Sequence, residues 1–246
     1  MKLRILFYLL LIFLLADIPS GCKKDTLITP TVAPNDFLSD KKYTSLIVEI
    51  QYVQGFQPSA QTLNNLTAFL QARLNKPNGI TFINENISSP NKSTYSLSDI
   101  QSIELNHRTQ NAKGNVLVVY FLFVDGDYAS NTSNGKILGI TYGSSSVVIF
   151  EKTIRDFSGG LGQPPTDVLE STVTEHEFGH VMGLVNFGTP MQTNHQDIPN
   201  GRHCNNQNCL MYYSVETSNV VANLLGGNIP SLDNNCLNDL KGNGGK

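Results

Sequence analysis

The apolar residues of this chain follow short strand-like and helix-like patterns after a polar N-terminal stretch. Residues 45–53 are β-branched and alternate, which predicts a strand. Residues 61–74 place leucines and a phenylalanine at helical spacing, which predicts an amphipathic helix. The other predicted strands cover residues 80–87, 116–124, 137–141 and 147–151. The stretch 88–98 between them is predicted as a loop.

The order of these elements predicts the class of fold. Residues 116–124 are continuously apolar, so this strand should be central and covered on both faces. A helix is predicted from Thr166 or Asp167 to Gly183, because two prolines precede it and a glycine ends it. The predicted order is a strand, a helix, further strands and a last helix. This order indicates an α/β (α+β) domain with a mixed twisted sheet on which the helices pack.

The first residues predict export from the cytoplasm. Lys2 and Arg4 precede an apolar run over 5–16, which is shorter than a membrane-spanning helix. Cys22 after Ser-Gly resembles a bacterial lipobox, in which the cysteine becomes the lipidated first residue, although Pro19 departs from the usual leucine. We expect a signal peptide over 1–22, a flexible tether over 23–42 and one domain over 43–246. Ordinary cleavage and an uncleaved anchor are the alternatives.

Composition narrows the possible functions. The 246 residues are enough for a large core, and 17 Lys and Arg against 20 Asp and Glu give a net charge of −3 without a basic run. This balance argues against nucleic-acid binding. Charged residues make up only 15% of the chain, a pattern that suits an extracytoplasmic protein.

The segment with the clearest chemistry lies in the last predicted helix, at His176-Glu177-Phe178-Gly179-His180. Two histidines at i and i+4 share one helix face, so both can direct a nitrogen to one Zn²⁺ while Glu177 acts as general base toward water. Gly179 costs about 1 kcal/mol against alanine in a helix. We expect it to let a neighbouring backbone approach the helix. The alternative is a poorly formed helix with two surface histidines.

The extended motif resembles a known family. Residues 176–183 match the HExxHxxG core of the metzincin zinc peptidases, and His203-Cys204, with Cys209-Leu210-Met211 after four residues, resembles the archaemetzincin branch. The resemblance implies a zincin-like fold with an N-terminal subdomain over 43–183 and a C-terminal one over 184–246. It also implies that Gly183 breaks the helix and that Met211 forms a Met-turn under the metal.

The chain departs from the family at the third zinc ligand. Asn186 occupies the usual position, and 184–202 reads as an insertion before the next candidates, His195 and His203. His203 is favoured because it keeps the eight-residue spacing to Met211. His195 is the alternative, because a long polar loop can bring any of its residues to the metal.

The cysteines of this chain also depart from the family pattern. The archaemetzincin branch holds a second, structural zinc with four cysteines. Beyond Cys22 this chain has only Cys204, Cys209 and Cys236, so a four-thiolate site is excluded. An oxidising compartment favours a disulfide among the three, with one thiol left over. Tyr213, two residues after Met211, resembles a tyrosine of the astacin and serralysin branches that reaches the zinc or the oxyanion.

The predicted function is a zinc-dependent metalloendopeptidase with one catalytic ion. Glu177 passes a proton from water to the leaving amine, Tyr213 supports the oxyanion, and an extended polypeptide substrate lies along the strand at 147–151. We expect a monomer outside the cytoplasm, attached to a membrane only by its lipid. Two alternatives stay open: a non-catalytic surface lipoprotein that binds polypeptide or glycan, and a structural zinc protein whose closed shell includes both His195 and His203.

Overall fold

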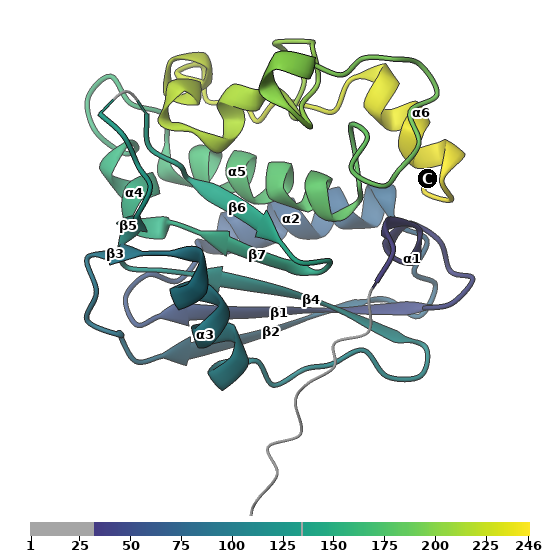
Figure 1. Ribbon diagram of the computed structural model, residues 1–246, viewed down its shortest axis with the longest axis horizontal. Coiled ribbons are helices and arrows are strands. Elements are labelled where there is room, and N and C mark those ends of the chain that lie inside the picture. Colours follow the sequence, from purple (N-terminus) through teal and green to yellow (C-terminus); the bar gives the residue numbers. More distant parts are fainter. Residues whose placement is uncertain (1–31, 134) are drawn as a thin grey trace, which may run out of the picture.

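The computed structural model describes residues 32–133 and 135–246. The predicted signal peptide, Cys22 and the tether as far as residue 31 lie outside the described residues. The chain folds around a five-stranded sheet in the order β2-β1-β4-β7-β6 (Figure 1). Four strands are parallel: β1 (Ser45–Val53), β2 (Ile80–Ile87), β4 (Val116–Phe123) and β7 (Ser146–Ile149). The edge strand β6 (Gly139–Tyr142) runs antiparallel to β7.

Helices cover both faces of this sheet. Helices α2 (Ala60–Arg73) and α5 (Thr166–Val181) lie on one face, and α3 (Leu97–His107) lies on the other (Figure 1). A short pair of strands, β3 (Thr94–Tyr95) with β5 (Asp127–Tyr128), and helix α4 (Glu151–Asp156) lie at one end. The result is a mixed α/β fold with a mostly parallel sheet.

The C-terminal part forms a further layer over α5. It contains three short 3₁₀ helices, η1 (Ile198–Asn200), η2 (Tyr213–Glu216) and η3 (Ser218–Leu224), and the helix α6 (Asn234–Gly242). Helix α5 is therefore enclosed between the sheet and this layer (Figure 1), and its residues from Val168 to Val181 are all buried. Among the described residues, no helix is long and apolar enough to cross a membrane.

The local patterns predicted the strands well. The strands at 45–53 and 80–87 have the predicted bounds, and the continuously apolar strand β4 is buried on both faces as expected. The predicted helix at 61–74 begins one residue earlier, because Ser59 accepts a hydrogen bond from the backbone N–H of Thr62 and caps it. Helix α5 begins at Thr166, and no side chain caps its N-terminus.

Two predictions about the N-terminal half are wrong. The tether was expected to extend to residue 42, but Phe37 and Leu38 of α1 (Pro34–Leu38) are fully buried. The ammonium of Lys76 donates to the backbone oxygens of Asp36, Ser39 and Tyr43, and this holds the segment against the domain. The stretch 88–98, predicted as a loop, contains β3 and the start of α3, a helix whose buried face consists of only Ile100 and Ile103.

The predicted position of the substrate is also wrong. The segment 147–151 was expected to offer a free sheet edge, but β7 pairs with β4 on one side and β6 on the other. A strand with two partners has no free backbone groups for a substrate. The outer strand on this side of the sheet is β6.

Candidate metal centre

Helix α5 brings His176 and His180 together on the face that points to the C-terminal layer. Their Nε2 atoms are 3.2 Å apart and their rings meet edge to face. His203 comes from the loop before η2, and its ring centroid lies 5.4 Å from that of His176 and 5.1 Å from that of His180. The three histidines and Glu216 each offer one ligand atom, all within 4.8 Å of one another. The chain thus assembles a compact group of metal-binding side chains.

Two backbone carbonyls orient these imidazoles. Nδ1 of His176 is 2.7 Å from the oxygen of Leu210, and Nδ1 of His203 is 2.7 Å from the oxygen of Asn200. Only a protonated nitrogen can donate to a carbonyl, so in the neutral rings both Nε2 atoms keep a lone pair. Burial lowers the pKa of His176 to about 4, which favours the neutral form that a metal requires. Together with Nε2 of His180, which lies 3.2 Å from Nε2 of His176, these nitrogens fit a zinc ion.

Glu177 lies beside the histidines and is fully buried. Its Oε2 accepts a hydrogen bond of 2.7 Å from the hydroxyl of Thr141 on β6, while its Oε1 has no partner among the described residues. Burial, together with the nearby charge of Glu216, raises the pKa of Glu177. A carboxylate with one fixed and one free oxygen beside a metal site is suited to accept a proton.

The edge strand β6 approaches Glu177 closely because of a glycine. A Cβ on Gly139 would lie 2.8 Å from Cγ and 2.9 Å from Oε1 of Glu177, so no side chain fits there. No motif in the sequence marks Gly139 or Thr141 as a site residue. The distance of 36 residues between Thr141 and Glu177 leaves no local signal for their contact.

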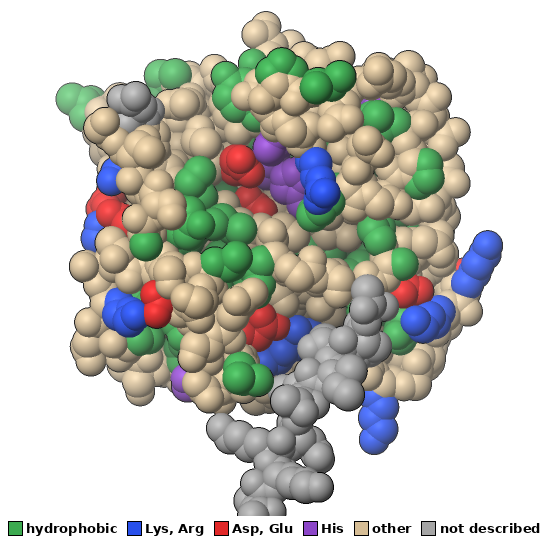
Figure 2. All heavy atoms as spheres, viewed as in Figure 1, with side chains coloured by type: hydrophobic (Ala, Val, Ile, Leu, Met, Phe, Trp, Pro, Cys, Tyr) green, Lys and Arg blue, Asp and Glu red, His purple; other side chains and the backbone are tan. Residues whose placement is uncertain are grey.

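A cavity of about 330 Å³ opens at this group of side chains. One wall is formed by β6 with Tyr128 and Ile137, and the other by Phe187, Arg202, His203 and Glu216. Figure 2 shows histidine and acidic side chains at the bottom of a hollow, with apolar and basic side chains around it. The site is therefore open to a ligand from one side.

Met211 lies directly against α5. A Cβ on Gly179 would be 2.2 Å from the sulfur of Met211, which is fully buried. The sequence predicted that a neighbouring backbone fills this space, and this is wrong: the side chain of Met211 fills it. The glycine is nevertheless required for packing.

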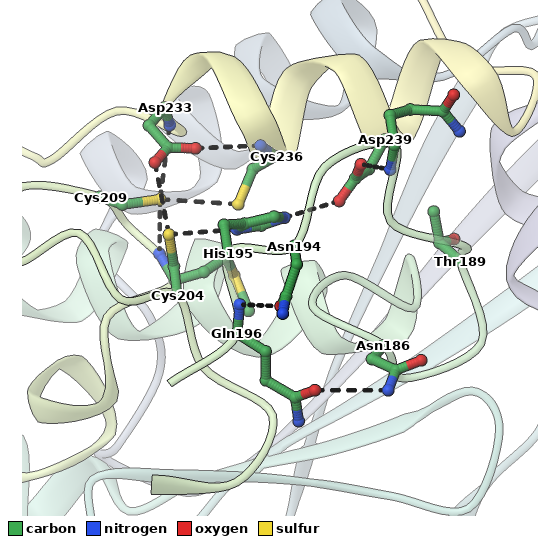
Figure 3. A network of polar contacts seen from close by, with 12 residues as sticks. Asn186, Thr189, Asn194, His195, Gln196, Cys204, Cys209, Asp233, Cys236 and Asp239 are labelled. Carbon is green, nitrogen blue, oxygen red and sulfur yellow. Dashed lines mark hydrogen bonds and ion pairs between the residues drawn. The ribbon is translucent and has the colours of Figure 1, made fainter. Parts of the chain in front are cut away.

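Gly183 ends the helical part of the motif with φ +74°, a conformation that glycine adopts most readily. The chain turns sharply here, and Val185 and Asn186 also have positive φ values of 51° and 61°. The side chain of Asn186 is exposed and donates to Oε1 of Gln196 at 3.3 Å (Figure 3). Asn186 is thus not part of the group formed by His176, His180 and His203.

His195 belongs to a different group, the cysteine cluster, in which His195, Cys204, Asp233 and Cys236 each offer one ligand atom within 4.8 Å of one another. Cys209 joins this cluster through its contact with Cys236 (Figure 3). Nδ1 of His195 is 3.3 Å from Sγ of Cys204, and Sγ of Cys209 is 3.7 Å from Sγ of Cys236. Because His195 and His203 lie in separate groups, the expected alternative of one closed shell with both is wrong. No disulfide links these three cysteines, which are all thiols.

The other nitrogen of His195 is fixed by a carboxylate. Its Nε2 is 2.8 Å from Oδ2 of Asp239 on α6, and both side chains are buried. Hydrogen bonds from the neighbouring thiols lower the pKa of Cys209, and the backbone N–H groups of Asp233 and Met211 add to the effect. A thiolate-favouring environment with a carboxylate-oriented imidazole is typical of zinc ligands.

Tyr213 does not take the expected position. It begins η2, its ring packs against Tyr212 at 4.7 Å, and it is not among the described residues that line the cavity. Three residues further on, the same short helix places Glu216 in the cavity instead. Glu216 was not predicted as a site residue, because no motif in the sequence marks it.

Comparisons with known proteins agree with this architecture. No family model and no curated protein matches the sequence. The structure is similar to that of an archaemetzincin from Methanopyrus kandleri, with a TM-score of 0.53 and 13% sequence identity, over 81% of this chain and 96% of that chain. At this identity the likeness shows the fold, and the chain therefore has an archaemetzincin-like fold.

Proposed function

We propose that this protein is a zinc-dependent metalloendopeptidase with His176, His180 and His203 as metal ligands and Glu177 as general base. The observation that carries the proposal is the meeting of three imidazoles beside a carboxylate with one free oxygen, at the base of an open cavity. The archaemetzincin-like fold supports the same chemistry. Met211 under α5 is consistent with the Met-turn that the sequence resemblance implies.

Each residue has a defined task in peptide hydrolysis. The three histidines would hold a zinc ion, which would supply Lewis acidity toward the scissile carbonyl and the attacking water. Glu177 accepts the proton of the attacking water and transfers it to the leaving amine. Thr141 holds one oxygen of Glu177, and the other has no hydrogen-bond partner among the described residues, so it is free to accept a proton. The outer strand β6, in place of β7, binds the extended substrate by adding a strand to the sheet.

The proposal includes a second, structural ion in the cysteine cluster. A tetrahedral zinc with sulfur ligands at about 2.3 Å separates two sulfurs by about 3.8 Å, and Cys209 and Cys236 are 3.7 Å apart. The ligands would be His195, Cys204, Cys209 and Cys236. Asp233 is a weaker candidate, because its carboxylate already accepts from the N–H of Cys236 and the amide of Asn206. The expected zinc content thus rises from one ion to two.

This ion would also support the catalytic ligands. Cys204 directly follows His203, and its N–H donates to the oxygen of Met211 at 2.7 Å. Leu210, whose carbonyl orients His176, lies between Cys209 and Met211. A metal that links Cys204 to Cys209 would therefore fix the loop that carries His203.

The site of action proposed from the sequence is extracytoplasmic, at a bacterial membrane, either in the periplasm or on the cell surface. Cys22 would carry the lipid, and the described domain would reach polypeptide substrates as a monomer. Replacement of Cys22 by serine should release the protein from the membrane fraction.

The catalytic assignment is tested by Glu177→Gln, with zinc content and cleavage of an unfolded protein as readouts. The variant should retain two zinc ions per chain and lose cleavage by about 100-fold or more, because a general base contributes on that scale. His107→Gln, an exposed change at the end of α3, is the control and should match the wild type. Zinc binding without cleavage in the wild type would favour the non-catalytic alternative, and zinc loss in Glu177→Gln would make Glu177 a ligand.

A further inference from the structure

Glu216 occupies a position in the metal centre that no catalytic step described above uses. It lies at the end of η2, and its side chain is 30% exposed toward the cavity. Its Oε2 is 3.4 Å from Nε2 of His203, and it forms part of the group of ligand atoms within 4.8 Å of one another.

The contact joins two atoms that both accept hydrogen bonds. Because Nδ1 of His203 donates to the oxygen of Asn200, the neutral ring presents the lone pair of Nε2 to Glu216. This Nε2 is buried and forms no hydrogen bond with a described residue. A carboxylate oxygen and a lone pair repel each other unless a cation, either a proton or a metal ion, lies between them.

The side of the ring that Glu216 contacts distinguishes a ligand from an orienting residue. A carboxylate that orients a metal-bound histidine contacts the nitrogen that does not bind the metal. Asp239 does this for His195, at the nitrogen opposite the thiol. Glu216 instead contacts Nε2 of His203, the same nitrogen that faces the metal position.

The distances agree with a fourth ligand. In a tetrahedral site with bonds of about 2.0–2.1 Å, neighbouring ligand atoms are about 3.3 Å apart. The distance between the Nε2 atoms of His176 and His180 is 3.2 Å, and that between His203 and Glu216 is 3.4 Å. Both distances thus match the edge of such a tetrahedron.

We propose that Glu216 is a displaceable fourth protein ligand, which closes the metal site in the resting protein and withdraws into the cavity when substrate binds. This inference rests on the proposed function, because the other three ligands are those of the peptidase site. The partial exposure of Glu216 and the cavity beside it give the side chain room to move. The protein would then be latent until a substrate carbonyl competes for the fourth position.

The experiment compares wild type, Glu216→Gln and Glu216→Ala, with Glu85→Gln on an exposed part of β2 as the control. Zinc affinity is measured by competition with a chelator, and azide is titrated into the cobalt-substituted proteins while the visible spectrum is recorded. Both Glu216 variants should bind zinc about 10- to 100-fold more weakly. They should bind azide at least about 10-fold more tightly, because the fourth position is open. Glu85→Gln should match the wild type.

Each outcome separates this inference from the proposed function. Unchanged zinc affinity and azide affinity in both Glu216 variants would overturn the fourth ligand and leave a proton between Glu216 and His203. In that case Glu177→Gln would still abolish cleavage, and the peptidase proposal would stand. If the His203→Ala variant bound metal as tightly as the wild type, both proposals would be overturned. The isosteric Glu216→Gln guards against a loss of folding in the alanine variant.

Discussion

In each of three site residues, one polar atom of the side chain is held by a hydrogen bond, and this leaves the other polar atom available for the chemistry. His176 and His203 each use Nδ1 to donate to a carbonyl, which directs the other nitrogen to the metal position. Glu177 uses one oxygen to accept from Thr141 and keeps the other free. A ring or carboxylate with one fixed atom loses little conformational freedom when it binds an ion or a proton.

The separation of His203 and His195 into two groups leads to the first prediction at this scale. His203→Ala should weaken zinc binding at the site of His176 and His180 by about 100-fold or more, because a direct ligand is lost. One of the two zinc ions per chain should therefore be lost. His195→Ala should remove the other ion. In cobalt-substituted protein, the sulfur-to-cobalt absorption should persist in His203→Ala and decrease in His195→Ala.

The control for this pair is His107→Ala, because His107 is an exposed histidine outside both groups. It should keep both ions and the full absorption. The opposite pattern, with sulfur-to-cobalt absorption lost in His203→Ala and retained in His195→Ala, would contradict the assignment of the two histidines.

At the level of elements, α5 is enclosed between the sheet and the C-terminal layer, and glycines permit both contacts. Gly139 brings β6 against Glu177, and Gly179 accommodates the side chain of Met211. The helix therefore has close neighbours on two sides at the motif itself. This close packing explains why α5 contains Gly179, although a glycine inside a helix normally destabilises the helix.

Gly179→Ala tests this packing. In an open helix the change would stabilise by about 1 kcal/mol. Here the added methyl would be 2.2 Å from the sulfur of Met211, so the free energy of unfolding should fall by about 1–3 kcal/mol, as in other overpacked cores. Urea unfolding of the metal-free protein measures the change.

Gly226→Ala is the matched control, because an added Cβ there meets only one side-chain atom, at 3.8 Å. Its stability should stay within about 0.5 kcal/mol of the wild type. A second change, Met211→Ala in the Gly179→Ala chain, should relieve part of the loss. A Gly179→Ala protein more stable than the wild type would show that Met211 does not pack against the helix.

At the level of the whole molecule, α4, α5 and the loop before α2 meet at a buried pair of carboxyl groups. Glu151 is 1% exposed and accepts a hydrogen bond of 2.6 Å from Nε of Arg155, while Glu170 accepts from the N–H of Ser59. Burial, together with the nearby charge of Glu170, raises the pKa of Glu151 to about 9. The folded protein therefore holds a proton that the unfolded chain releases near pH 4.5.

This proton makes stability depend on pH in a defined direction. Between about pH 5 and pH 9 the folded state binds one more proton than the unfolded state at Glu151, so the free energy of unfolding should fall as pH rises. The slope from one proton is at most about 1.4 kcal/mol per pH unit. Glu151→Gln should flatten the profile measured by urea unfolding at several pH values, and the exposed Glu85→Gln should leave it unchanged. An identical slope in Glu151→Gln would contradict the buried proton.

Local patterns in the sequence predicted the features that depend on neighbouring residues. Strands β1 and β2 have the predicted bounds, and α5 carries its two histidines one turn apart, because strand and helix periodicity act over a few residues. The short α1 and α3 were missed because each buries only two apolar side chains, too few for a periodic signal.

Only the tertiary structure decided which distant residues meet. Packing between segments far apart in the chain places β6 at the sheet edge. The same packing brings Thr141 into contact with Glu177, and it brings Glu216 beside His203. The same packing placed His195 with the cysteines, 44 residues from its partner Asp239. Such contacts follow from the burial of α5 between two layers, and no local spacing records how those layers approach each other.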